Sequence, residues 1–174
     1  KKVSENTAPL IIAELGINHE GSLNVAKNMA KLAVENGANI IKNQTHILDD
    51  EMSKEADEFK IKYLNKSIYS IMKENSLSRE KEEKLKKYVE NELNSIYLST
   101  PFSRAAADFL MDIGIKFFKI GSGECNNLPL LKHIAKFNKP MILSTGMNNI
   151  KSIKKSVSLL NQYDVPLIIM HTTN

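Results

Sequence analysis

The hydrophobic positions of this chain form six short runs, and each run ends in a small group of polar or charged residues. The runs occupy residues 10–13, 40–41, 96–98, 117–118, 141–143 and 167–170. The polar residues that follow them are Glu14; Lys42 and Gln44; Ser99 and Thr100; Lys119, Ser122 and Glu124; Ser144 and Thr145; His171, Thr172 and Asn174. Short continuous apolar runs predict buried strands. Because catalytic groups lie at the carboxyl ends of the strands in a parallel α/β barrel, the pattern predicts an enzyme.

Amphipathic stretches with helical spacing separate the predicted strands. Each follows a residue suited to capping a helix N-terminus: Ser22, Ser78, Ser103, Asn126 or Asn127, and Asn148 or Asn149. Gly37 and Gly114 follow two of these stretches and are suited to ending them. Strands that alternate with helices predict βαβ units, which close into a barrel or form a doubly wound sheet.

One connection is longer than a simple crossover. About fifty residues separate Thr45 from Ser95, which predicts an extra loop and helix. The acidic cluster at residues 49–51 lies there, and we expect it to be a solvated loop or helix N-terminus rather than a metal site.

The number of strands leaves two architectures open. A closed barrel of this kind has eight strands, and the sequence stops at Asn174 directly after the sixth. We therefore expect either an open six-stranded sheet or an incomplete barrel. In an incomplete barrel the first and sixth strands are unpaired apolar edges, so we expect residues 1–174 alone to be insoluble, molten or dimerised through them.

Composition excludes several classes of protein. The 174 residues are 42% hydrophobic, enough for one core and one domain, and the net charge of +4 is mild. Lysines mixed with glutamates at residues 79–84 predict a solvated helix face, and without a segregated basic face we expect no nucleic-acid partner. A single cysteine, Cys125, excludes an internal disulfide and is typical of the cytosol. No apolar run is long enough for a membrane span, and we expect a cytoplasmic protein.

Two lysines indicate an anion site. Lys42 and Lys119 occupy equivalent places on the second and fourth predicted strands, where an ammonium group needs an anion or water. Together they predict a cationic, hydroxyl-rich pocket for phosphate or carboxylate with Thr100, Ser122, Ser144 and Asn174. Two alternatives stay open, namely lysines that extend outward between helices, and a lysine that forms a Schiff base.

Other polar residues have a chemical and a structural interpretation. Two glycines around Ser122 let backbone amides approach a bound anion. Glu14 is a candidate acid or base, or a structural partner of one of the lysines.

The remaining candidates are the four histidines and the cysteine. His19 and His46 are placed to line the mouth of the site, His133 is expected at the surface, and His171 is expected to face away from Met170 and Thr172. No two histidines have the spacing of a helical metal pair, so we expect no metal ligand in this chain. We expect Cys125 to be structural.

Five segments contain most of these polar residues. They are residues 12–21 (IAELGINHEG), 42–46 (KNQTH), 99–103 (STPFS), 119–124 (KIGSGE) and 143–147 (LSTGM). In this order and at this spacing they closely resemble the sialic acid synthases (N-acetylneuraminate synthases), from about Pro9 to Asn174.

The resemblance implies a TIM barrel and a condensation reaction. Residues 1–174 would be the first six βα units of an N-terminal synthase barrel, without strands seven and eight or the C-terminal antifreeze-like domain of bacterial members. The implied reaction joins phosphoenolpyruvate to an open-chain N-acetylhexosamine, typically N-acetylmannosamine, and gives a nine-carbon 2-keto acid and phosphate. The full-length protein would be a homodimer, and this part alone would be inactive.

The resemblance also assigns roles by motif position. Phosphoenolpyruvate would be held by Lys42, Thr100, Lys119, Ser122, Ser144 and Asn174. Gln44 and Glu124 would contact the sugar, and Glu14 would assist the chemistry. A divalent metal, manganese or magnesium, would polarise the sugar aldehyde, with its two histidine ligands on strands outside this sequence.

One departure from the family leaves the sugar open. Residues 59–66 lack the Pro-Gly-Asn turn that helps many members to bind the sugar, and Tyr63 lies near its place. A hexosamine that leads to legionaminic or pseudaminic acid is therefore an alternative. A different phosphoenolpyruvate-using or Schiff-base aldolase, or a truncated protein that binds phosphorylated ligands without turnover, also stays open.

Overall fold

Six strands form the centre of the protein. The structure is a computed structural model and describes residues 6–61 and 65–172, so Tyr63 and Asn174 lie outside the described residues. The strands are β1 (Ile12–Gly16), β2 (Ile40–Thr45), β5 (Ile96–Pro101), β6 (Phe118–Ile120), β7 (Met141–Ser144) and β8 (Leu167–Met170). Each coincides with one of the six apolar runs, so the prediction of six strands is confirmed.

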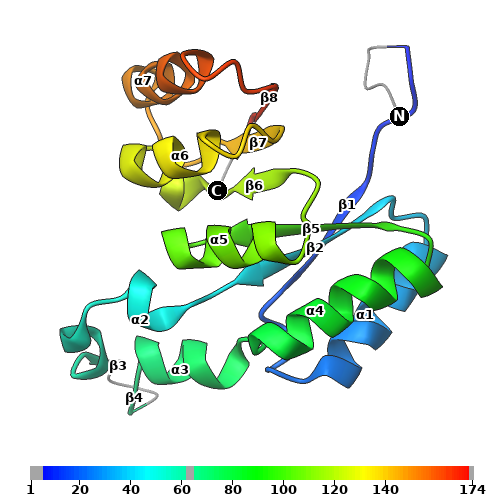
Figure 1. The fold of residues 1–174 in the computed structure, drawn as a ribbon. Coiled ribbons are helices and arrows are strands. Elements are labelled where there is room, and N and C mark those ends of the chain that lie inside the picture. The colour runs from blue at the N-terminus through cyan, green and yellow to red at the C-terminus, as the bar shows by residue number, and fades with distance from the viewer. Residues whose placement is uncertain (1–5, 62–64, 173–174) are drawn as a thin grey trace.

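The strands form two parallel sheets rather than one continuous ladder. The order is β1-β2-β5 in one and β6-β7-β8 in the other, with parallel pairing throughout. β5 and β6 lie next to each other and join the two sheets (Figure 1). The predicted α/β class with parallel strands is confirmed.

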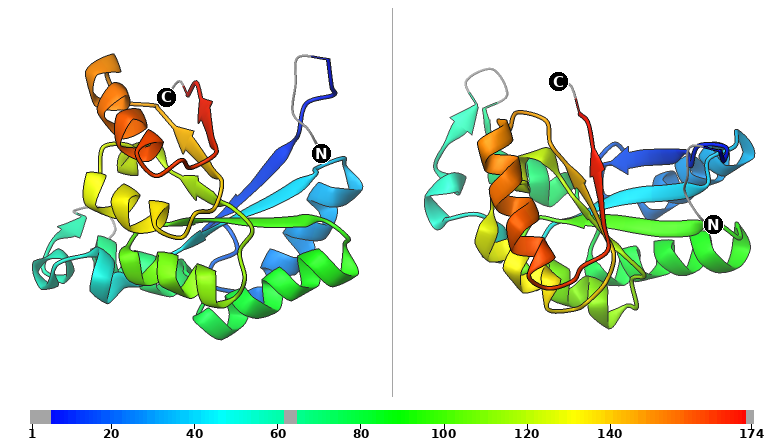
Figure 2. Two further views of the ribbon diagram at one scale, coloured as in Figure 1. Left: turned by 45° about the horizontal axis from the view of Figure 1, so that its top comes forward. Right: turned by 90° about the horizontal axis from the view of Figure 1, so that it is seen from above.

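Helices cover the outer side of the strand layer (Figure 2). They are α1 (Leu23–Glu35), α4 (Arg79–Lys87), α5 (Arg104–Asp112), α6 (Leu128–Ala135) and α7 (Ile150–Asn161). Their N-caps are the expected Ser22, Ser78, Ser103, Asn127 and Asn149, each of which accepts a backbone N–H bond. In the described part of the chain, no helix has the length and apolar character needed to cross a membrane.

The long connection between β2 and β5 contains more structure than predicted. It holds α2 (Leu48–Glu51), a 3₁₀ turn (Lys54–Asp57), the short strands β3 (Lys60–Ile61) and β4 (Lys66–Ser67), and α3 (Ile68–Asn75), all before α4. A π-helical turn (Tyr88–Glu92) extends α4, and a 3₁₀ turn (Ser122–Glu124) follows β6.

The acidic cluster of this connection is divided among separate partners. Asp49 accepts a hydrogen bond from the hydroxyl of Tyr69, and Asp50 accepts one from the backbone N–H of Ala105. Glu51 faces His46. The cluster therefore anchors the connection to α3 and α5, and its residues lie in the first turn of α2, in agreement with the expected helix N-terminus.

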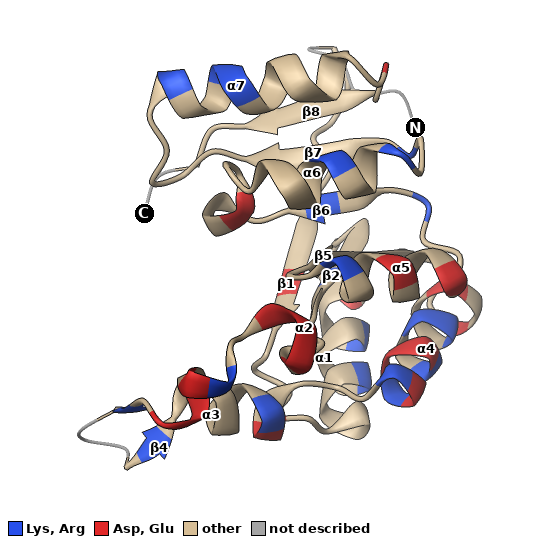
Figure 3. Cartoon of the chain, turned by 60° about the vertical axis from the view of Figure 1, so that its left-hand side comes forward, with Lys and Arg blue, Asp and Glu red and all other residues tan. Residues whose placement is uncertain are grey.

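The face of α4 is not wholly solvated. Lysines and glutamates alternate along it (Figure 3), with ion pairs from Glu80 to Lys84 and from Glu83 to Lys87. Glu82, however, is only 2% exposed, so the prediction for residues 79–84 is wrong at this position. The reason is its helical spacing from the fully buried Leu85, which directs both side chains against the sheet.

Buried hydroxyl groups surround the Glu82 carboxyl. Thr45 donates to Glu82 over 2.6 Å and Tyr97 over 2.9 Å, while Ser99 lies 2.6 Å from the hydroxyl of Thr45. Complete burial raises the pKa of Glu82, although these hydroxyl donors act in the opposite direction. This polar network links α4 to β2 and β5.

Candidate active site

The alternation of β2 divides its polar side chains between two faces. Asn43 and Thr45 are buried on the side of the helices, while Lys42 and Gln44 are partly exposed on the opposite side. Glu14 is the neighbour of Lys42 in the β1–β2 register, and Thr100 is the neighbour of Gln44 on β5. The strand pairing thus collects the predicted residues at the carboxyl ends of three adjacent strands.

Lys42 bridges the first and third of these strands. Its ammonium group forms an ion pair with Glu14 and donates to the hydroxyl of Thr100 over 3.2 Å. The second carboxylate oxygen of Glu14 accepts the backbone N–H of Gly16 at 3.0 Å. This ion pair agrees with the interpretation of Glu14 as a structural partner of a lysine. The alternative role of Glu14 as a catalytic acid or base remains a prediction.

Lys119 points into the same region from the second sheet. It is 6% exposed, and its ammonium group donates to the Ser144 hydroxyl over 2.6 Å and to the Ile120 carbonyl over 2.8 Å. Burial, and to a lesser extent the positive charge of Lys42, lower the pKa of Lys119 to about 8, while Glu14 acts in the opposite direction. A buried ammonium without a paired carboxylate favours binding of an anion.

A pocket of about 460 Å³ joins the two sheets at these lysines. The structure therefore brings both lysines to one cavity, as expected, rather than outward between helices. Its lining comes from β1, β2, β6, β7, β8 and the segment after β8: Ile12, Glu14, Lys42, Lys119, Ser144, Met170, His171 and Thr172.

Four of the predicted site residues are not part of this lining, namely Gln44, Thr100, Ser122 and Glu124. The Ser122 hydroxyl accepts the backbone N–H of Gly146 at 3.0 Å, and the Glu124 carboxylate accepts the amide of Asn127 at 2.6 Å. Gly121, directly before the 3₁₀ turn that contains Ser122 and Glu124, lies next to Thr100: a Cβ built on Gly121 would lie 3.7 Å from the Thr100 methyl group.

The histidines differ from expectation in three places. His46 does not line the pocket, since its side chain is 3% exposed. His19 does not line the mouth, since it is 1% exposed, with Nε2 3.2 Å from Asn43 and Nδ1 accepting from Gly21. Burial lowers the pKa of His19. His171 lines the pocket with Met170 and Thr172 instead of facing away, because strand alternation ends at Met170.

The remaining predicted side chains occupy structural positions. His133 is partly buried and lies 2.7 Å from Asp108. Cys125 is fully buried, burial raises the pKa of its thiol, and this fits the structural interpretation. Within residues 6–61 and 65–172, no three His, Cys, Asp or Glu side chains gather in a way that could hold a metal ion.

The sequence did not reveal the surroundings of Gln44. His46 lies 3.2 Å from the Gln44 side-chain oxygen, and Glu51 contacts the other ring nitrogen. The available signal was the position of His46 two residues after Gln44 on the same strand end. Glu51 could not be singled out from the sequence, because the acidic cluster at residues 49–51 has the composition of an ordinary solvated segment.

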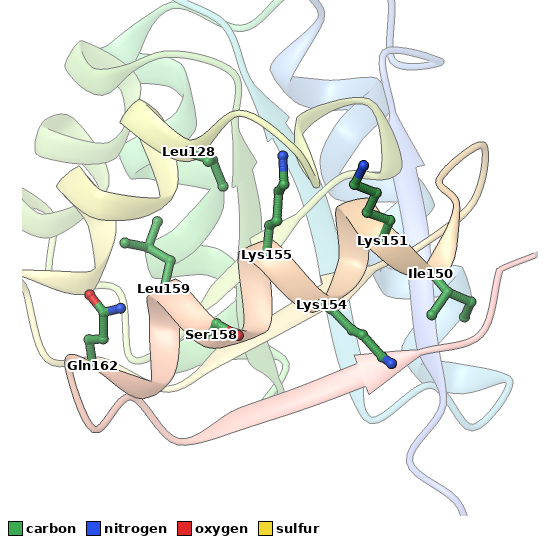
Figure 4. Close-up of a pocket in the computed structure, with 8 residues that line it drawn as sticks. All are labelled: Leu128, Ile150, Lys151, Lys154, Lys155, Ser158, Leu159 and Gln162. Atoms are coloured by element: carbon green, nitrogen blue, oxygen red, sulfur yellow. The ribbon is translucent and has the colours of Figure 1, made fainter.

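A larger groove, of about 940 Å³, lies away from these residues, where α7 faces Leu128 of α6 (Figure 4). Lys154 points away from Lys151 and Lys155, so the lysines of the groove do not converge on one point. The smaller pocket at Lys42 and Lys119 is therefore the better candidate site.

Comparison with known proteins identifies the family of this chain. The model of the NeuB family matches residues 29–174. The chain belongs to the NeuB family. The N,N'-diacetyllegionaminic acid synthase of Campylobacter jejuni is 40% identical over 156 residues, which cover 87% of this chain and 46% of that protein. Human N-acetylneuraminate-9-phosphate synthase is 31% identical over 167 residues, covering 94% of this chain and 46% of that protein.

Solved structures of the NeuB family share the fold. The N-acetylneuraminic acid synthetase of Leptospira borgpetersenii, solved with citrate, superposes with a TM-score of 0.80 at 27% identity. The match covers 98% of this chain and 58% of that one. The chain spans about half the length of the curated relatives that it matches.

Proposed function

We propose that this chain is the N-terminal part of a synthase that condenses phosphoenolpyruvate with an open-chain N-acetylhexosamine. The product is a nine-carbon 2-keto acid of the sialic type, and phosphate is released. The observation that supports this most strongly is the convergence of Lys42 and Lys119 from two sheets on one pocket with Glu14 and Ser144. Membership of the NeuB family supports the reaction class.

In this proposal the phosphoenolpyruvate anion replaces the internal partners of the lysines. Lys42 and Lys119 bind its phosphate and carboxylate, and the hydroxyl groups of Thr100, Ser122 and Ser144 donate to its oxygens together with the Asn174 amide. Gln44 and Glu124 contact the sugar. N-acetylmannosamine is the first acceptor to test, and the C. jejuni relative supports a diacetamido hexose as the second.

The proposed chemistry forms one carbon–carbon bond and breaks one carbon–oxygen bond. C3 of phosphoenolpyruvate attacks the sugar aldehyde, whose oxygen takes a proton and becomes a hydroxyl group. Water adds to the resulting cation at C2 and loses a proton, for which Glu14 is the nearby base. The tetrahedral intermediate then expels phosphate, and the 2-keto group forms.

The complete enzyme is proposed to be a closed TIM barrel whose first six βα units are present here, with a C-terminal antifreeze-like domain and a homodimeric assembly. A divalent metal, manganese or magnesium, would polarise the aldehyde. Because the described residues offer no cluster suited to it, its ligands are proposed to lie outside this chain.

A Schiff-base aldolase is the second candidate, because the pKa of Lys119 is lowered to about 8 and a neutral amine is a nucleophile. Borohydride treatment of the full-length protein with its keto acid product separates the two reactions. The synthase proposal expects no covalent adduct, whereas an adduct at Lys119 would favour the aldolase.

The proposal is tested by measuring phosphate release from phosphoenolpyruvate with and without N-acetylmannosamine or the diacetamido hexose. Release by the full-length protein should require both substrates. Lys119→Met should reduce it by about 10²-fold or more, since a buried charge-assisted contact is lost. Lys116→Met, at an exposed position three residues earlier, is the matched control. Release that is independent of the sugar would contradict the proposal.

A further inference from the structure

A buried histidine holds the side chain of Gln44 from one end. His46 Nε2 lies 3.2 Å from Gln44 Oε1, and His46 Nδ1 lies 2.9 and 3.1 Å from the two carboxylate oxygens of Glu51. The His46 side chain is 3% exposed, and its ring stacks on Phe102 with centroids 4.4 Å apart. Both ring edges and one ring face are therefore occupied, so the imidazole has one orientation.

The other end of the Gln44 amide lies on the side of Gly16 and Glu14. A Cβ built on Gly16 would lie 3.8 Å from Gln44 Nε2 and 3.7 Å from Glu14 Oε1. The amide nitrogen thus lies on the side of Glu14, and the amide oxygen lies on the side of His46. Gln44 presents two N–H donors where its partly exposed side chain borders the site.

The reversed amide would place the NH₂ group of Gln44 against His46 Nε2 and its carbonyl oxygen on the side of Glu14. In the observed orientation each ring nitrogen of His46 lies opposite an oxygen acceptor: Nε2 faces the Gln44 amide oxygen, and Nδ1 faces the Glu51 carboxylate.

The acidic cluster explains why Glu51 is available for this contact. Asp50 accepts the backbone N–H of Ala105 at 2.9 Å, and Asp49 accepts the hydroxyl of Tyr69 at 3.0 Å. These bonds fix α2 between α5 and α3, and so they hold Glu51 against His46.

We propose that Glu51 and His46 are positioning residues that fix the Gln44 amide with its NH₂ group toward the pocket. Gln44 then donates a hydrogen bond to an oxygen acceptor of the sugar, namely an amide carbonyl or a hydroxyl oxygen. A sugar group that can only donate hydrogen bonds is disfavoured at this position. This inference rests on the proposed function, in which Gln44 contacts the sugar.

A double-mutant cycle in the full-length protein tests the kinetic part. Glu51→Gln should raise the KM for the sugar by about fivefold to tenfold, the scale of one misdirected hydrogen bond, and leave the KM for phosphoenolpyruvate unchanged. It should have little further effect in a Gln44→Ala background, because the amide that it orients is gone. Glu58→Gln, exposed in the same connection, is the matched control. Additive effects of the two variants would overturn the inference.

The nitrogen-15 spectrum of the His46 ring tests the orientation without any activity. Nε2 should carry a proton in the full-length protein, because it faces the Gln44 amide oxygen. In that case Nε2 donates and the Gln44 oxygen must accept. An unprotonated Nε2 would overturn the inference, since the NH₂ group of Gln44 would then donate a hydrogen bond to this nitrogen. Absence of condensation would overturn the proposed function alone, and the spectrum would still decide the orientation.

Discussion

Lys119 carries a charge that its surroundings do not fully balance. Its ammonium group has a hydroxyl and a carbonyl as partners, whereas the only carboxylate among the described residues that line the pocket pairs with Lys42. Burial therefore lowers the pKa of Lys119 to about 8. A bound dianion would supply the missing countercharge, so ligand binding and protonation of Lys119 are coupled.

Binding of phosphoenolpyruvate should weaken as the pH rises through about 8. Below that value Lys119 is charged and attracts the anion, and above it the neutral amine does not. Calorimetric titration of the full-length protein between about pH 7 and pH 9 measures this. In Lys119→Arg the pH dependence should vanish, while binding at pH 7 is weaker because the guanidinium is larger and planar. A wild-type Kd that stays constant over this range would contradict the assignment.

Glu14→Gln separates the two roles of Glu14. If Glu14 handles a proton, turnover should fall by about 10²–10⁴-fold while the Kd for phosphoenolpyruvate changes little. Single-turnover kinetics and calorimetry on one preparation give both values. Unchanged turnover would leave Glu14 with only its structural pairing to Lys42.

The residues at strand ends could be predicted from the sequence, because their place follows from one rule about parallel strands. Lys42, Lys119 and Ser144 needed no knowledge of the helices. His19 and Glu82 were misplaced since their burial depends on which helix face meets the sheet, and Glu82 stands among charged neighbours that hide this. The side of His171 depends on where β8 ends, which no pattern gives.

At the scale of elements, α4 is joined to the sheet through Glu82 as well as through apolar packing. The carboxyl accepts from Thr45 on β2 and from Tyr97 on β5. Its raised pKa means that the folded protein holds this proton more tightly than the unfolded chain does.

The free energy of unfolding should therefore fall as the pH rises above the ordinary glutamate value of about 4.3. Glu82 contributes at most one proton, or about 1.4 kcal/mol per pH unit. Glu82→Gln keeps the acceptor and removes the ionisation, so its Tm should decline less between pH 5 and pH 8. Glu83→Gln, on the exposed side of α4, is the control. Equal declines in wild type and Glu82→Gln would contradict this view of α4.

Some helices and strands could be predicted from the sequence, whereas others could not. Strands and capped helices follow from local patterns, and the five helices whose N-caps were predicted begin where expected. In the connection between β2 and β5 an extra loop and helix were predicted, and α3 confirms the extra helix. The shorter elements α2, β3 and β4 were not predicted, because they are too short to show a period. The α2 helix is nevertheless the element that delivers Glu51 to His46.

At the scale of the whole molecule, the outer strands are the exposed elements. In the described residues β8 pairs only with β7 and β1 only with β2. Ile168 and Ile169 on β8 are 50% and 49% exposed, and Ile11 beside β1 is 53% exposed.

Residues 1–174 expressed alone should therefore associate or precipitate, because apolar unpaired edges bind other edges. Light scattering across a concentration series measures this, and no synthase activity is expected. Ile168→Lys with Ile169→Lys should increase solubility. A soluble monomer that unfolds cooperatively and is active would contradict the account.

The central claim is that water adds at C2 and that phosphate then leaves by cleavage of the C2–O bond, not of the P–O bond. The most direct test is the reaction of the full-length protein with phosphoenolpyruvate and its sugar in oxygen-18 water, followed by mass spectrometry of the phosphate. The account predicts phosphate without oxygen-18, since the water oxygen stays on the keto acid. Phosphate that contains oxygen-18 would contradict it.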